Sequence, residues 1–288
     1  MPKTKSRTVA IRRGFSFQKL DWPVVIGIGA MHLGIVAAPF SFSWTGLGIM
    51  LVLTWLTAGV GITLCYHRLL THRSFKSPKW FEYLITVCGS LAWQGSSVQW
   101  VGIHRIHHQH SDDQEDPHSP KEGFAWSHVF WCLHKEPDGR CAADAAKDLQ
   151  RDIFHRVLHR FGWLFQIVLA AALFLLGEWF GGVGISWVIW GICVRTVVVY
   201  HSTWFVNSAA HTWGYRNYDT KDQSANLWWV ALLSFGEGWH NNHHAFPRSA
   251  AHGLRRFEFD PTYWTIRLLG LAGLAKDIIV PEPQDRPT

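Results

Sequence analysis

The feature that most restricts the fold of this chain is a set of four apolar runs. They cover approximately residues 22–40, 44–66, 161–180 and 183–205. A helix needs about 20 predominantly apolar residues to cross the hydrocarbon core of a bilayer. Three uncharged residues separate the first two runs, and Gly181-Gly182 separates the last two. We therefore predict an all-α integral membrane protein whose four transmembrane helices form two hairpins.

The positions of the lysines and arginines predict the orientation of these helices. Basic residues lie in residues 1–20, between His67 and Arg160, and after His211, whereas the two short turns have none. Because basic residues accumulate in cytoplasmic loops, both termini and the middle segment should be cytoplasmic. A net charge of +6 could also indicate nucleic-acid binding, but its uneven placement and 18 tryptophans favour a membrane and no nucleic-acid partner.

The remaining segments complete the predicted organisation. Residues 1–20 form a basic cytosolic tail, and residues 21–280 form a single domain. Within it, residues 84–98 are apolar but too short for a crossing and predict an interfacial or re-entrant helix. Residues 99–160 and 206–280 form a cytosolic cap, and the proline-rich residues 281–288 a disordered tail. The five cysteines include no C-x-x-C pair, so no disulfide framework is expected.

Histidines recur in a pattern typical of metal ligands. The motif His-x-x-His-His occurs at His104–His108 and again at His240–His244. His67 and His72 follow the second apolar run, and Asn207 and His211 follow the fourth. Since helix positions i, i+3 and i+4 share a face, each copy of the motif could aim three imidazoles at one point. The predicted topology puts all four elements on the cytoplasmic side. Neutral imidazole suits Zn, Cu, Fe and Ni, and nine candidate ligands indicate two ions rather than one.

We call these histidine-containing segments boxes. The boxes, their order and their spacing resemble those of the membrane fatty acid desaturases, over most of the chain. Further matching phrases are Gly61-Ile62-Thr63, Asp116-Pro117-His118, Gly123-Phe124-Ala125-Trp126-Ser127-His128, Asn207-Ser208-Ala209-Ala210-His211, Gly214-Tyr215-Arg216 and Gly236-Glu237-Gly238-Trp239-His240. Together they are similar to the delta-9, stearoyl-type branch.

The resemblance implies a non-haem di-iron centre at the boundary between membrane and cytosol. The implied iron ligands are His67, His72, His104, His107, His108, His211, His240, His243 and His244, with Asn207 near one iron through water. The implied reaction uses O2 and two electrons to remove two hydrogens from a saturated acyl chain, which gives a cis double bond expected at delta-9. Carboxylates that could orient the imidazoles are Asp112, Asp113, Asp116, Asp219, Asp222 and Glu237; taken singly, each is about as easily a solvated loop charge.

One departure from the family pattern bears on the substrate. Acyl-CoA-using members typically have Arg-Asp just before the second box, where this chain has Gly102 and Ile103. The local sequence before the second box resembles that of the bacterial and cyanobacterial acyl-lipid branch. A lipid-bound acyl chain is therefore the expected substrate, with acyl-CoA as the alternative. A separate ferredoxin or b-type cytochrome is the expected electron donor.

Several polar or bulky residues outside the boxes have two interpretations each. Leu51 and Trp55 share the helix face of His67 and could close the far end of an acyl tunnel, although helix packing explains them equally well. Arg195 lies within the fourth run, where it could contact a substrate headgroup; pairing inside the helix bundle is the favoured interpretation. Structural roles are expected for the nine other histidines, which are His32, His110, His118, His128, His134, His155, His159, His201 and His252.

Three other functions compete with desaturation. A hydroxylase or other oxygenase could use the same di-iron site, and its product would gain an oxygen. A membrane cytochrome with bis-histidine haem would need histidine pairs facing each other within the spans, whereas these cluster at span ends. A role in metal transport would not explain the segment Asn207-Ser208-Ala209-Ala210-His211.

Overall fold

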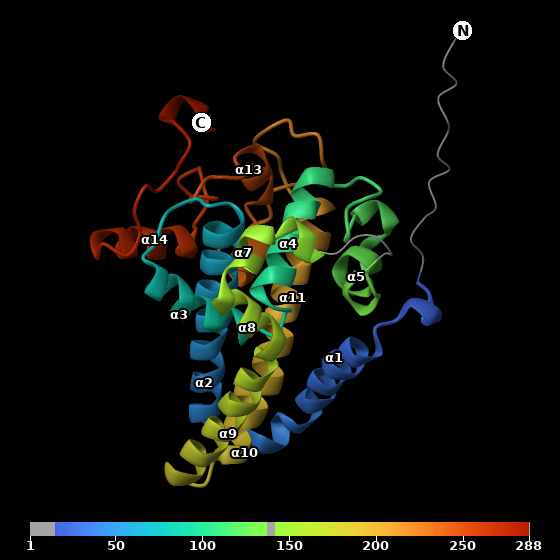
Figure 1. Cartoon of the computed structure of the whole chain (residues 1–288), viewed down its shortest axis with the longest axis vertical. Coiled ribbons are helices and arrows are strands. Elements are labelled where there is room, and N and C mark those ends of the chain that lie inside the picture. Colours follow the sequence, from blue (N-terminus) through green and yellow to red (C-terminus); the bar gives the residue numbers. More distant parts are fainter. Residues whose placement is uncertain (1–14, 137–141, 288) are drawn as a thin grey trace.

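Long apolar helices at one end and a cap of short helices and loops at the other organise the molecule (Figure 1). The computed structural model describes residues 15–136 and 142–287, in which every regular element is helical and only isolated β-bridges occur. The main helices are α1 (Trp22–Gly34), α2 (Trp44–Thr54), η4 (Trp55–Thr71), α3 (Lys79–Ser90), α4 (Ser97–His110), η6 (Trp126–Phe130), α5 (Trp131–Leu133), α6 (Ala142–Ala145), α7 (Lys147–Arg151), α8 (Ile153–Phe161), α9 (Trp163–Trp179), α10 (Gly184–Val188), η7 (Ile189–Val194), α11 (Arg195–Ser208), η8 (Ala209–His211), α12 (Trp228–Leu233), α13 (His240–Ala245) and α14 (Pro261–Leu271).

Two continuous helices are long and apolar enough to cross a membrane. They run over Trp44–Thr71, which joins α2 to η4, and over Gly184–His211, which joins α10, η7, α11 and η8. A third candidate is the pair α8 and α9, which is bent by 64° between the two helices. The first apolar run forms a shorter helix, Trp22–Ala37. The all-helical fold is thus confirmed, and the structure supports two or three spans by length and composition.

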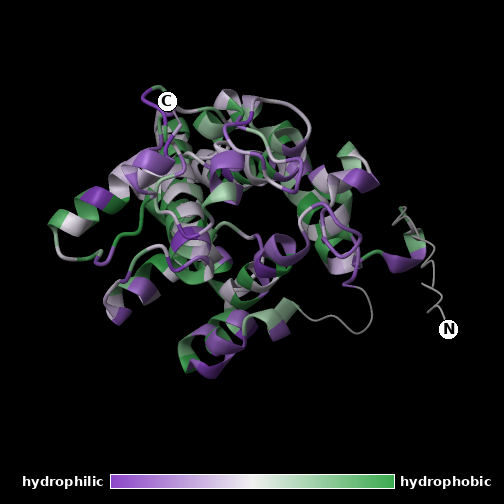
Figure 2. Ribbon diagram, turned by 90° about the horizontal axis from the view of Figure 1, so that it is seen from above, coloured by the Kyte–Doolittle hydropathy of each residue, from purple (hydrophilic) through white to green (hydrophobic). Residues whose placement is uncertain are grey.

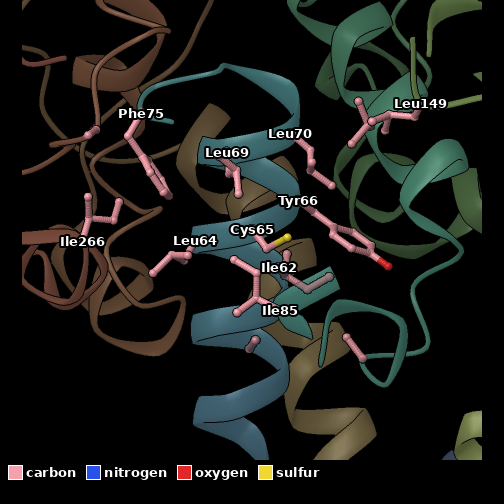
Figure 3. Close-up of a cluster of buried hydrophobic side chains, with 14 of the residues drawn as sticks. Ile62, Leu64, Cys65, Tyr66, Leu69, Leu70, Phe75, Ile85, Leu149 and Ile266 are labelled. Carbon is pink, nitrogen blue, oxygen red and sulfur yellow. The ribbon is translucent and has the colours of Figure 1, made fainter. Parts of the chain in front are cut away.

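The core of the molecule surrounds η4, a π-helical continuation of α2. Its side chains, including Leu64 and Tyr66, pack against residues from distant segments such as Phe75 and Ile266 (Figure 3). The helix α3 approaches η4 closely at Gly61, where an added Cβ would lie 2.4 Å from the backbone nitrogen of Gly89. Only glycine permits this approach, and the resulting packing fixes the helix that carries His67.

The stretch 84–98 differs from the single interfacial helix that its composition predicts. The helix α3 ends at Ser90, a turn follows, and α4 begins at Ser97. Trp93 (φ 58°) and Gly95 (φ 93°) adopt the left-handed conformation, which interrupts a right-handed helix. Ser96 and Gln99 then form a capping box that starts α4. The break therefore creates a new helix start directly before the second histidine box.

Arg195 is buried inside the helix bundle, as its structural interpretation predicts. Its guanidinium donates to the carbonyl oxygens of Gly191 (3.0 Å) and Leu91, and to Oε1 of Gln166 at 3.4 Å. These contacts tie α11 to the turn after α3 and to α9. The cation is therefore satisfied by neutral oxygens of the protein itself.

The cap presents largely hydrophilic loops when seen from its own end (Figure 2). The last described residues belong to it, because the Tyr218 hydroxyl donates to the carbonyl oxygen of Asp285 at 2.8 Å. A short helix, Pro283–Asp285, forms there. This part of the expected disordered tail is therefore folded against the cap. The basic residues 1–14 lie outside the described residues.

Candidate metal centre

The nine histidines expected as ligands converge in two adjacent groups. The first group contains His67, His72, His104, His108 and His243, and the second His107, His211, His240 and His244. Within each group one nitrogen of every ring lies within 4.8 Å of the others. The groups touch through the stacked rings of His108 and His244, whose centroids are 4.7 Å apart. Side chains from four segments thus surround two neighbouring points.

Each His-x-x-His-His box divides its rings between the two groups, which differs from the expectation that one box aims all three at one point. His104 and His108 join the first group and His107 joins the second. In α13 the pattern is reversed, because His240 and His244 join the second group and His243 the first. Helix positions i and i+4 are about 40° apart, whereas adjacent positions are about 100° apart. The duplicated motif therefore links the two groups through both helices.

Asparagines hold α13 in place although it is only six residues long. Helices this short are not stable alone, so tertiary contacts must fix it. Oδ1 of Asn242 accepts hydrogen bonds from the amides of Asn217 (2.8 Å) and Asn226 (2.9 Å). Its own amide donates to Oε2 of Glu258 and to the carbonyl oxygen of His252, both at 2.8 Å. Oδ1 of Asn241 accepts from the backbone N–H groups of Asn217 and Tyr218, both at 2.8 Å. The two asparagines between the histidines thus position the box, a role that the sequence pattern did not reveal.

Four of the six candidate carboxylates contact a ligand histidine. In each case a carboxylate oxygen lies near Nδ1 of the ring, at 2.6 Å for His67–Glu237, 2.9 Å for His107–Asp116, 3.0 Å for His211–Asp112 and 2.7 Å for His244–Asp222. Asp113 and Asp219 instead remain exposed. A carboxylate at Nδ1 fixes the proton there and turns Nε2 towards the metal.

This arrangement of ring nitrogens fits a bound cation. A neutral imidazole has one N–H group, so His107 and His244, whose Nδ1 atoms donate to carboxylates, carry lone pairs on Nε2. Those two Nε2 atoms face each other at 3.4 Å. In the first group Nε2 of His67 similarly faces Nε2 of His243 at 3.1 Å. Facing lone pairs repel unless a cation lies between them, as at His107 and His244, and the converging ring nitrogens of both groups have the donor chemistry of a metal site.

Burial lowers the pKa of six imidazoles and so favours the neutral form that binds metal: His72, His104, His108, His240, His243 and His244. At His107 burial is outweighed by Asp116, which raises the pKa. Burial, opposed by the hydrogen bond to Asp222, lowers the pKa of His244 to about 4. Although burial alone would raise it, the neighbouring His67, His252 and Arg68 hold the pKa of the Glu237 carboxyl well below its usual range. Glu237 is therefore an anion at neutral pH, as a partner for a metal-bound imidazole should be.

Two histidines outside the boxes share the orienting carboxylates. Nδ1 of His252 lies 3.1 Å from Oε2 of Glu237, the same oxygen that contacts His67. Nδ1 of His118 lies 3.6 Å from Asp116. Both rings are buried. Arg68, also buried, donates to Glu237 and, at 2.9 Å, to Oδ2 of Asp260. His252 and Arg68 thus support the carboxylate beside the first group, and His118 lies beside the carboxylate of the second. As isolated histidines in the sequence, His118 and His252 gave no sign of this role.

A cavity of about 1000 Å³ leads to this centre. Its walls come from α1, α4, α5 and α11 and include Trp100, His104 and Thr203. A smaller cavity lies beneath both histidine groups and is lined by His67, His104, His107 and His240. Trp100, His104, Thr203 and Asn207 line both cavities. Gln94 connects this junction, because it donates to Oγ1 of Thr203 at 2.9 Å and accepts from Nε1 of Trp100 at 3.2 Å.

The other expected site residues fall in different places. Asn207 lies one helical turn before His211 and borders both cavities, beside the histidine groups. Leu51 and Trp55 are 58% and 48% exposed and line neither cavity. The face of a helix that borders a cavity depends on the neighbouring helices, which spacing from His67 alone does not specify.

Known proteins are similar in sequence to this chain over most of its length. Residues 42–266 match the family described as fatty acid desaturase. The chain is 47% identical over 262 residues to an sn-1 stearoyl-lipid 9-desaturase of Anabaena variabilis, covering 90% of this chain and 94% of that protein. It is 48% identical to a protein of the same name from Synechocystis, over 90% and 80% of the two chains. It is 45% identical to an sn-2 palmitoyl-lipid 9-desaturase of Nostoc, over 96% of both.

Proposed function

The chain belongs to the fatty acid desaturase family, and from that premise we propose that it introduces a cis double bond at carbon 9 of a saturated acyl chain carried by a membrane lipid. The observation that carries this proposal is the meeting of two histidine groups above a cavity that can hold an acyl chain. The balanced reaction converts CH2–CH2, O2, two electrons and two protons into CH=CH and two waters.

Iron is the proposed metal of both histidine groups, with Asn207 near one ion through water. Two bound irons would supply the O2-derived oxidant that amino-acid side chains cannot provide. The chain's own residues hold and orient the centre: imidazoles bind, and Glu237, Asp116, Asp112 and Asp222 fix their Nδ1 protons. The burial of these groups excludes water from the reacting carbons.

The two cavities give the acyl chain a path past the histidines. A cavity of about 1000 Å³ lies at the upper end of the range for small-molecule sites, roughly 300–1,000 Å³. The indole and aliphatic part of its lining, including Trp100, Trp204 and Ile28, suits a hydrocarbon. The charged residues Lys19, Asp21, Glu115, Lys135 and Glu136 also line it. The chain would then pass between Trp100 and Thr203, where the small cavity lies beneath both groups.

Blocking this junction should stop the reaction without removing the metal. Thr203→Trp places a bulky ring where the two cavities meet, so we expect at least a tenfold loss of desaturation with unchanged iron content. Val198→Trp, on the same helix but 37% exposed, is the matched control and should retain activity. Full activity of the Thr203 variant would remove the proposed path.

Trp55→Ala separately tests the hypothesis that Leu51 and Trp55 close the far end of an acyl tunnel. If they do, the variant should give products with longer acyl chains.

A membrane-lipid substrate is favoured over acyl-CoA by the residues before the second box. Ile103 lines the large cavity, and Gly102 packs against α6. An added Cβ at Gly102 would lie 1.8 Å from the carbonyl oxygen of Ala142. Since that contact is with backbone, the position has no room for a longer side chain. The two positions therefore offer no charged group to a CoA headgroup.

This close contact predicts a stability effect. Gly102→Ala should lower the melting temperature by several degrees, because overpacking typically costs about 1–3 kcal/mol. The matched control is Gly48→Ala in α2, where an added Cβ meets nothing within 4 Å. Thermal unfolding in detergent measures both. Equal melting temperatures of the Gly102 variant and the unsubstituted protein would contradict the proposed packing.

We also propose that four helices cross the membrane and that the termini and the metal centre face the cytoplasm. The charge bias of the loops supports this orientation. The short α1 and the bent pair α8 and α9 would supply the crossings beyond the two long helices. Labelling of a cysteine introduced at Thr45 or at Gly181 tests this orientation. A membrane-impermeant thiol reagent should reach either cysteine only from the outer side of the membrane.

Expression in a host without its own desaturase tests the proposed activity. Fatty-acid profiling of each separated lipid class should reveal a new monounsaturated chain, 2 mass units below its precursor, with the bond at carbon 9. A product gaining oxygen would instead identify a hydroxylase. Absence of any new chain in the presence of a reduced electron carrier would overturn the proposal.

A further inference from the structure

A group of cations forms a surface beside the second histidine group. We propose that this basic patch, defined as Arg216, Lys221, Arg248, Arg255 and Arg256, is the docking site of a water-soluble, acidic one-electron carrier. The inference rests on the proposed function, in which each desaturation consumes two electrons. It goes further by assigning the surface at which those electrons arrive.

The patch is positive because the neighbouring carboxylates point inward. Glu237, Glu258 and Asp260 are all at least 94% buried, and Asp222 contacts His244. Within residues 212–260, all of which the structure describes, Asp219 is the only acidic residue that is exposed. Using the carboxylates to hold the metal site and α13 thus leaves more exposed cations than exposed carboxylates among residues 212–260. Glu282 and Asp285 of the C-terminal segment lie at the rim, together with Arg286.

Contacts among loop residues bring the segments of Arg216, Lys221, Arg248 and Arg255 together, and Arg256 directly follows Arg255. The Arg216 guanidinium donates to the carbonyl oxygens of Thr220 (2.8 Å) and Asp222 (2.7 Å), which curls the loop that carries Lys221. The Arg255 guanidinium lies 5.8 Å from the centre of the Tyr215 ring. Tyr218 packs on Phe246, with ring centroids 5.1 Å apart, two residues before Arg248. The loop after α11 and the segment after α13 therefore share one surface.

A short route connects this surface to the metal site. Lys221 precedes Asp222, whose Oδ2 lies 2.7 Å from Nδ1 of His244. His244 turns its Nε2 towards His240 in the second group, at 3.0 Å. A carrier seated on the patch would thus be separated from a metal ligand by one side chain. Electron transfer slows steeply with distance, so a docking surface here has a kinetic advantage.

The place of the patch also indicates what kind of partner it receives. The loop after α11 and α13 lie at the cap end, opposite the turn between α9 and α10 (Figure 1). A partner there meets water rather than lipid. None of the five cations lines either cavity, so carrier and acyl chain would not compete. Complementary charge accelerates association and orients the encounter, and it fits an acidic protein that binds transiently.

Charge reversal tests the inference. Lys221, Arg248 and Arg256 make no hydrogen bond or ion pair within the described residues, so reversing them should leave the site intact. We would measure desaturation by the purified enzyme Lys221→Glu/Arg248→Glu/Arg256→Glu, driven by a reduced acidic [2Fe–2S] ferredoxin. The half-saturating ferredoxin concentration should rise at least tenfold at low salt. For the unsubstituted enzyme it should rise with salt, because screening weakens the attraction.

A control triple and a second reductant separate docking from other effects. Lys121→Glu/Arg151→Glu/Lys276→Glu changes the net charge equally at exposed residues outside the patch and should behave like the unsubstituted enzyme. With dithionite and a small mediator, the patch variant should retain full activity. An unchanged ferredoxin requirement, or an equal loss with both reductants, would overturn the docking site. Inactivity of the unsubstituted enzyme with both reductants would count against the proposed function itself.

Discussion

Replacing either His107 or His243 by alanine should abolish the new double bond while the protein remains in the membrane. His107 belongs to the second histidine group and His243 to the first, so each variant removes one ligand from a different proposed metal site. Loss of an orienting partner alone typically costs 10–100-fold in metal affinity or activity, and loss of a ligand should exceed about 100-fold. Fatty-acid profiling in a desaturase-free host and iron per purified protein measure the effect.

His110→Ala is the matched control for these two variants. His110 ends the same helix as His107 but lies outside both groups, where Nε2 contacts Glu115 at 3.3 Å. The control should keep its iron and its activity. Retained desaturation in both ligand variants would refute the assignment of the histidine groups.

Glu237→Ala should release iron from the first group and destabilise the protein. The substitution removes the partner of His67 and His252 and one of the two carboxylates that face buried Arg68. Arg68 keeps Asp260 as its ionic partner, so the cost comes from the buried N–H groups that lose their acceptor, typically about 1–3 kcal/mol each. Metal affinity should also fall about 10–100-fold. Thermal unfolding of the iron-free protein separates the first effect from the second.

Glu282→Ala provides the comparison for Glu237→Ala. Glu282 is exposed, so its removal should change stability by no more than about 0.5 kcal/mol. If Glu237→Ala left both the melting temperature and the iron content unchanged, the carboxylate would have no part in orienting His67.

Much of the site was predictable because its signals are local in sequence. Box spacing, carboxylates near the boxes and apolar runs led to all nine histidines and to Glu237, Asp116, Asp112 and Asp222. The division of each box between two groups was not predicted, because it depends on where the opposing helix lies. The contribution of His252, which meets Glu237 only in the folded chain, had no local signal either.

The fold was predicted less completely than the site. Hydropathy indicates apolar helices but not their breaks, so it does not reveal the turn at Trp93 and Gly95 within residues 84–98. The same turn supplies Gln94 to the cavity junction. Their spacing from His67 puts Leu51 and Trp55 on its helix face, yet the helix presents them to the outside. Helical periodicity identifies residues on one face; the neighbouring helices decide which face borders the cavity.

The most direct measurement is anomalous diffraction at the iron absorption edge on crystals of the iron-loaded protein. We expect two neighbouring iron peaks, one bound by His67, His72, His104, His108 and His243 and the other by His107, His211, His240 and His244. A single peak, or two peaks whose histidine ligands come from opposite sides of the membrane, would contradict this account.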